Sequence, residues 1–170
     1  MIPGYSPEGW GDLFLAAAGA TAALSGLIFV GLSVNIRTVL ETDKRVGQNF
    51  LTGRAAEALA ALLIVLVVSL VGLTPDIPRG ALAAFILLSG LASATSPIRA
   101  LLASRQQAAI GFPLLLRLVT AAGLTVSLLL SGVTLVTGHG GGLYWLPVAF
   151  VLAIAIAAIN AWVLLVEVLR

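Results

Sequence analysis

The chain has 170 residues, of which 60% are hydrophobic and only 9% are charged, whereas about 25% of the residues of an ordinary soluble domain are charged. A water-soluble globule of this length leaves roughly a third of the surface of its unfolded chain exposed, so it could not hide so much apolar surface. The composition therefore predicts an integral membrane protein that has the lipid bilayer as its solvent.

The formal net charge is +2, and the chain has no cysteine. A sequence pI near 9.7 would suit a nucleic-acid-binding protein, but the basic residues lie between apolar blocks rather than in one patch. That distribution is typical of charge at a membrane surface, and we expect no nucleic-acid partner. The absence of cysteine excludes thiolate catalysis, Cys-ligated zinc and iron–sulfur clusters.

Five apolar blocks approach or exceed the roughly 20 residues that a helix needs to cross a hydrocarbon core about 30 Å thick. They predict an all-α integral membrane bundle of five transmembrane helices that forms a single domain over residues 1–170. Segment 37–54 is expected to be a cytoplasmic loop, and turn-forming residues separate spans two and three and spans four and five. The expected spans are approximately 13–36, 55–74, 80–98, 118–138 and 143–166.

Two features affect the ends of these spans. Arg37, Glu41 and Arg45 are four residues apart, which predicts that helix continues beyond span one into the cytoplasm. Pro97 should kink or end span three because it frees the carbonyl of Ser93. Residues 97–112 therefore either continue span three or lie at the membrane interface.

The orientation follows from the Lys and Arg residues between the spans. Eight of the nine fall on one side of the predicted topology and Arg79 alone falls on the other, a strong positive-inside signal. It predicts an N-terminus outside and a C-terminus in the cytoplasm of a cell membrane, which we take to be a bacterial inner membrane. The eight residues are Arg37, Lys44, Arg45, Arg54, Arg99, Arg105, Arg117 and Arg170.

Span four carries a polar stripe at helical spacing. Small and hydroxylated side chains let helices approach closely, and a hydroxyl bond between helices contributes about 0.6 kcal/mol on average, so the stripe can be a packing surface. Alternatively, it lines a hydrated path in an oligomer, with Arg117 at the cytoplasmic mouth. The candidate path consists of Arg117, Thr120, Ser127, Ser131 and Thr134.

The other spans contain further polar and small residues. Span two is apolar all round apart from Ser69, so we expect it to face lipid. Polar groups inside a membrane usually find partners, and the candidates for such contacts are Asn35, Ser89, Ser93, Ser96, Asn160 and Glu167. Small residues on one helix face favour close helix packing, and the candidates are Gly19, Ala23 and Gly26 in span one and Ala149, Ala153 and Ala157 in span five.

We expect no enzyme, no cofactor and no metal. His139 is the only histidine; it lies in a glycine-rich loop, and no second nitrogen or sulfur ligand is available to build a zinc or haem site. Carboxylates are predicted on the same side of the membrane, but no residue is marked as a nucleophile.

The run from Trp10 to Asn35, with its core LFLAAAGATAALSGLIFVGLSVNI, resembles the opening of a group of short actinobacterial-type polytopic membrane proteins. Residues 53–59, GRAAEAL, and 69–75, SLVGLTP, extend the resemblance to about 70 residues. Most members have no assigned activity, and some carry the label "modulator of FtsH protease". The resemblance implies an accessory or regulatory subunit, and it assigns no functional residues.

Two functions follow as expectations. The polar stripe and the small-residue faces favour a homo-oligomeric membrane assembly that forms a pore or a channel for ions or small solutes. The alternative is an accessory or regulatory subunit of a larger membrane complex such as a membrane protease, with a larger membrane protein as its partner.

Overall fold

The computed structural model describes residues 3–46, 50–104 and 112–168, and in these ranges the chain is helical and has no strand. Five segments of the described ranges are long and apolar enough to cross a membrane. The α-helices are α1 (Gly11–Val34), α2 (Ile36–Val46), α3 (Phe50–Gly72), α4 (Arg79–Ser93), α5 (Thr95–Ser104), α6 (Phe112–Thr137) and α7 (Leu146–Val168), and the short 3-10 helices are η1 (Pro3–Tyr5), η2 (Pro7–Trp10) and η3 (Gly142–Trp145).

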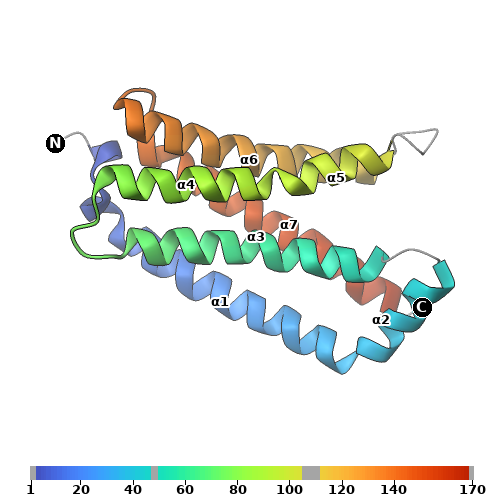
Figure 1. Ribbon diagram of the computed structural model, residues 1–170. Helices are drawn as coiled ribbons and strands as arrows, with labels where there is room; N and C mark the ends of the chain where they lie inside the picture. The colour runs from blue at the N-terminus through green and yellow to red at the C-terminus, as the bar shows by residue number, and fades with distance from the viewer. Residues whose placement is uncertain (1–2, 47–49, 105–111, 169–170) are drawn as a thin grey trace.

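The long helices run alternately up and down the bundle (Figure 1). α1 begins at the end where the α3–α4 and α6–α7 connections lie, and α7 ends at the opposite end, as an odd number of passes requires. We call the first of these the loop end. The other is the charged end, because α2, the start of α3 and the start of α6 bring Lys44, Arg54, Glu57 and Arg117 there.

One face of α3 packs inside the bundle and the other is exposed. Leu62, Val65, Val68 and Ser69 are fully buried, because α3 packs against α1, α4 and α7. Leu63, Val67 and Leu70 on the other face are 46–55% exposed, so the expectation that span two faces lipid applies to that face and not to the buried one. Lipid tails are as apolar as leucine, so a uniformly apolar helix suits the centre of a bundle as well as its surface. α3 also begins at Phe50, inside the segment predicted as loop.

α1 ends at Asn35, where the backbone leaves helical geometry, and α2 continues in a new direction (Figure 1). The predicted helix over residues 37–45 is thus confirmed, although it is separate from α1. Asp43 of α2 is buried and accepts hydrogen bonds from the backbone amides of Leu51, at 2.8 Å, and Thr52, at 3.2 Å. A carboxylate at this position satisfies free amides of the first turn of α3 and complements its helix dipole.

Span three is interrupted once and then continues. α4 ends at Ser93, Ala94 forms a turn, and α5 starts at Thr95. Pro97 is the third residue of α5, in its first turn, where a missing backbone amide costs little. Residues 97–104 therefore extend the span, which reaches Leu102, while residues 105–111 lie outside the described part of the chain.

α4 and α6 pack closely through glycine. A Cβ atom at Gly132 would lie 2.5 Å from Cγ of Leu87, and one at Gly90 would lie 2.9 Å from a methyl carbon of Leu129. Small residues let membrane helices approach in this way. Ser93 and Thr125 add a hydrogen bond of 3.0 Å between the hydroxyls of the two helices.

Candidate functional site

Five polar side chains from four helices meet inside the bundle near the charged end. The centre of the group is the carboxylate of Glu57, whose side chain is only 7% exposed. We call the group the Glu57 cluster. Its members are Arg54 and Glu57 of α3, Ser96 of α5, Arg117 of α6 and Asn160 of α7.

Arg117 holds Glu57 through both carboxylate oxygens. Its Nη2 lies 2.8 Å from Oε2, and its Nε donates to Oε1 at 3.2 Å. The two parallel contacts form the bidentate geometry that makes Arg–carboxylate pairs strong and specific. The Ser96 hydroxyl donates to the same Oε1, so Glu57 links α3 to both α5 and α6.

Asn160 connects the cluster to α7. Its side-chain nitrogen donates to Oε2 of Glu57 at 3.5 Å, and its oxygen accepts a hydrogen bond of 3.1 Å from Nη1 of Arg54. Asn160 is 2% exposed, so the amide finds partners inside the protein, as a polar group in a membrane should. With two guanidinium groups and one carboxylate, the cluster carries a formal charge of +1.

The structure places the stripe of α6 inside the single chain. Ser131 is fully buried, and Ser127 and Thr120 are at most 9% exposed. Thr120 and Thr134 donate back to carbonyls of their own helix, and Thr134 also accepts the backbone amide of Gly142 at 3.0 Å. Only Arg117 joins the Glu57 cluster. The hydroxyls therefore pack and cap rather than face a surface that a second copy could share.

The remaining candidates for polar contacts have separate environments. Ser93 bonds to Thr125, Ser96 and Asn160 belong to the Glu57 cluster, and Ser89 is half-buried. Asn35 donates to the carbonyl of Gly31 at 2.9 Å, one turn earlier in α1. Glu167 lies in the last turn of α7, and its side chain is outside the described part of the structure.

The two predicted packing faces differ in their surroundings. Ala149, Ala153 and Ala157 of α7 are buried inside the bundle, at 2% exposure or less. Gly19, Ala23 and Gly26 of α1 are instead exposed. A Cβ atom at Gly19 or Gly26 would meet nothing within 4 Å. In the described part of the chain, nothing packs against Gly19 and Gly26 on this face of α1.

The loop end contains contacts that the sequence did not reveal. Arg79 donates to the carbonyls of Leu135 and Val136 in the last turn of α6, and its guanidinium carbon lies 5.2 Å from the centre of the Tyr5 ring. The Tyr5 hydroxyl accepts the amide of Gly141 at 2.9 Å. A cation favours the carbonyl end of a helix, so Arg79 stabilises the end of α6 as well as contributing to the charge pattern.

Neither a metal-binding group nor a related protein adds to the description of the site. The described residues contain no group of three or more His, Asp or Glu side chains that could hold a metal ion. His139 is exposed, and its Nδ1 lies 3.0 Å from the carbonyl of Thr137. No family model, curated protein or solved structure matches the chain.

Proposed function

We propose that the protein is a non-enzymatic membrane protein that assembles with a second copy of itself through the exposed face of α1. The observation that carries the proposal is the pairing of two properties on that face. Gly19, Ala23 and Gly26 are small, and all three are exposed among the residues that the structure describes. We call this surface the α1 small-residue face.

Membrane helices associate through such surfaces because lipid offers no hydrophobic driving force, so close van der Waals packing decides. All copies insert with the same orientation, so a symmetric contact between two α1 helices is parallel, as in small-xxx-small pairs. The opposite side of α1 is already packed against its own bundle, because Phe14, Ala17 and Thr21 are buried there. The small-residue face is therefore the side of α1 that is left for a second copy.

A pore is not part of this proposal. A path shared between copies needs hydroxyl groups on the outer surface of α6. Ser127 and Ser131 are buried inside the chain instead, so the polar stripe gives an oligomeric channel no support.

Disulfide cross-linking in membranes tests the assembly, since the chain has no native cysteine. We expect Ala23→Cys to form a covalent dimer on mild oxidation. Ala84→Cys, on the exposed surface of α4, is the matched control and should stay monomeric. Gly19→Leu should abolish the dimer without unfolding the monomer, because the added side chain meets open space. Monomeric Ala23→Cys would reject the proposal.

An accessory subunit is the second candidate, because the α1 small-residue face could equally receive a helix of a larger membrane protein. It is also what the resemblance of residues 10–75 implies. Photo-cross-linking in native membranes, from a benzophenone attached to Ala23→Cys, distinguishes the two candidates because it needs no cysteine on the partner. A product with the mass of one chain plus a larger protein, without a dimer of this chain, would favour the accessory subunit.

We also propose an orientation of the chain in the membrane. The positive-inside rule supports a cytoplasmic charged end and an external loop end. Two single-cysteine variants test it with a membrane-impermeant thiol reagent on intact cells. His139→Cys, at the loop end, should be labelled, and Lys44→Cys should be protected until the cells are lysed; the reverse pattern would invert the topology.

A further inference from the structure

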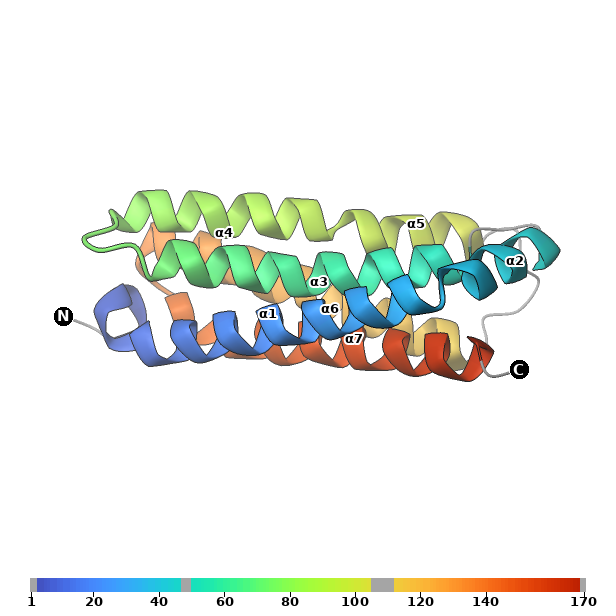
Figure 2. The ribbon, with the colours of Figure 1, turned by 90° about the horizontal axis from the view of Figure 1, so that it is seen from below.

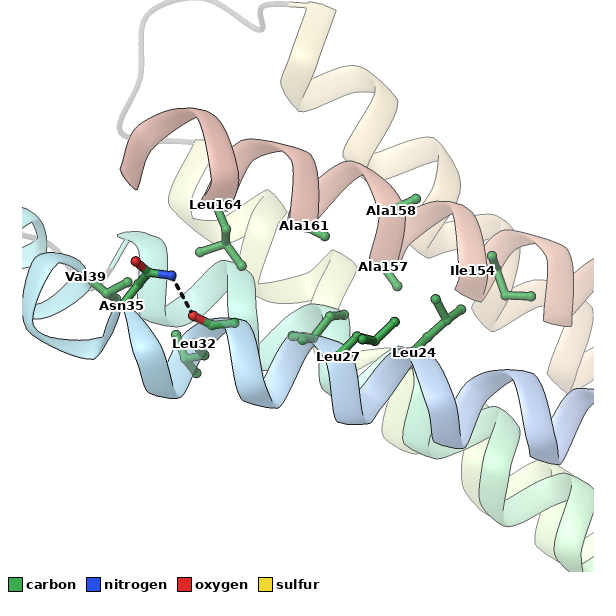
Figure 3. A pocket seen from close by; sticks show the side chains of 12 residues that line it. Leu24, Leu27, Leu32, Asn35, Val39, Ile154, Ala157, Ala158, Ala161 and Leu164 are labelled. Carbon is green, nitrogen blue, oxygen red and sulfur yellow. Dashed lines mark hydrogen bonds between the residues drawn. The ribbon is translucent and has the colours of Figure 1, made fainter. Parts of the chain in front are cut away.

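A groove runs between α1 and α7, on a side of α1 distinct from the small-residue face (Figure 3). Its volume is about 330 Å³. In Figure 3 the side chains of Leu24 and Leu27 point from α1 towards Ala157 and Ala158 of α7. Figure 2 shows the two helices along the same side of the bundle.

The groove exists because α1 packs mainly on α3 and makes few direct contacts with α7. The last buried residue of α1 is Thr21. Further along α1, a Cβ atom added at Gly31 would meet no other atom within 4 Å. The facing residues of α7 include Ala157 and Ala161. Ala58 and Leu62 of α3, which are fully buried, pack with Leu24, Ile28 and Ala157 and close the groove on the bundle side.

We infer that this groove binds one acyl chain of an anionic phospholipid from the leaflet at the charged end. Its walls belong to α1 and α7, two of the segments that are apolar enough to cross a membrane. The lining is apolar apart from the amide of Asn35, so it opens to the hydrocarbon of the bilayer rather than to water.

The length of the groove matches a single leaflet. Leu24 and Asn35 are eleven residues apart, or about 16 Å along a helix that rises 1.5 Å per residue. Half of a hydrocarbon core of about 30 Å is about 15 Å. The headgroup end of the groove therefore lies at the turn between α1 and α2, where Asn35 and Val39 line it, and Leu24 lies near the middle of the bilayer.

The narrowness of the space favours a single chain over a helix. The side chains of α1 and α7 leave a volume of about 330 Å³ between them, whereas a helix with its side chains is about 10 Å across. A partner helix could touch the rim of the groove but could not fill it. An extended acyl chain is narrower and flexible, so it can follow the curved wall of leucine and alanine side chains.

Charge at the headgroup end favours an anionic lipid. Arg54 lies one turn before Ala58 on α3, and its guanidinium donates a hydrogen bond to Asn160. In the sequence of α7, Asn160 lies between Ala157 and Ala161, which line the groove. Arg37, two residues beyond Asn35, is exposed. Basic residues near a membrane surface attract anionic headgroups by about 1 kcal/mol each.

Native mass spectrometry tests the inference on the whole protein, purified from nanodiscs of phosphatidylethanolamine and phosphatidylglycerol. We expect one phosphatidylglycerol per chain to survive a delipidating detergent wash. Gly31→Leu combined with Ala161→Leu fills the groove and should lower retention about tenfold or more, since a filled site has no room for the chain. Neither residue is buried, so the variant should fold.

Ala84→Leu is the matched control. It adds the same side chain to an exposed position on α4 and should leave retention unchanged. Added phosphatidylglycerol should also raise the thermal midpoint of the wild type, but not that of the filled variant, since a ligand stabilises the state that binds it. The inference is overturned if the filled variant retains lipid as the wild type does, or if phosphatidylethanolamine is retained as well as phosphatidylglycerol.

Discussion

Arg117 of α6 and Glu57 of α3 form a bidentate ion pair, with 2.8 Å between Arg117 Nη2 and Glu57 Oε2, although 60 positions separate them in the sequence. The pair joins two helices that are not consecutive in the chain. Because the Glu57 side chain is 7% exposed, removing one partner would leave a charge without compensation in an apolar setting.

Arg117→Ala should therefore destabilise the bundle. Breaking a buried ion pair costs about 3–5 kcal/mol, and we expect about 3 kcal/mol because 30% of the Arg117 side chain remains exposed. The measurement is the thermal midpoint of the purified protein in detergent. Arg99→Ala is the control, since Arg99 is exposed on α5 and its loss should change the midpoint little.

A double replacement separates the ion pair from the rest of the Glu57 cluster. Replacing both members of a buried ion pair by apolar residues of similar size is often neutral or stabilising. Glu57→Leu combined with Arg117→Leu should thus recover most of the stability that Arg117→Ala loses. A double variant as unstable as the single one would mean that Ser96 and Asn160 depend on the carboxylate more than the pair itself does.

The contact between α4 and α6 predicts a second stability effect. At Gly132 a methyl group would lie 2.5 Å from Cγ of Leu87, and overpacking of this kind costs about 1–3 kcal/mol. Gly132→Ala should lower the thermal midpoint accordingly. Gly80→Ala, on α4 and with nothing within 4 Å of the added atom, is the matched control and should leave the midpoint unchanged or raise it slightly.

The number of spans and their approximate limits followed from the sequence because apolar block length is set by bilayer thickness. Which face of α3 is buried did not follow. α3 is uniformly apolar, so its sequence does not distinguish the buried Val65 and Val68 from the exposed Leu63 and Val67. The hydroxyl stripe of α6 is visible in the sequence as a face, but its direction inwards depends on packing.

The Glu57 cluster was only partly visible in the sequence. Arg54 and Glu57 are three residues apart and could be taken as a pair within one helix. In the structure Glu57 reaches across to Arg117 instead, and Arg54 bonds to Asn160. Sequence spacing predicts contacts within a helix, whereas these contacts depend on how α3, α6 and α7 are placed. The available signal was the position of Glu57, an acidic residue at the start of an apolar span, on the same side as the basic ends of other spans.

Asp43 predicts a local effect at the start of α3. Asp43→Ala removes the acceptor of the amides of Leu51 and Thr52, and the loss of a helix cap costs about 1 kcal/mol. We expect faster amide exchange at Leu51 and Thr52, with little change at Val65 in the same helix. Glu41→Ala, at an exposed position of α2, is the control, and equal exchange in both variants would contradict a capping role.

Arg79 predicts a corresponding effect at the other end of the bundle. Arg79→Gln removes the cation beside the carbonyls of Leu135 and Val136 and its contact with the Tyr5 ring. Because the residue is exposed, we expect a loss of only about 0.5–1 kcal/mol. It should appear as faster amide exchange over residues 138–142, measured by mass spectrometry.

Arg79→Lys separates the charge from the geometry at this position. Lysine keeps the cation near the end of α6 but lacks the planar guanidinium group that spans two carbonyls and stacks on a ring. We expect it to restore part of the protection over residues 138–142. Full restoration would show that charge alone holds the end of α6, and no restoration would show that the contact with Tyr5 and both carbonyls is required.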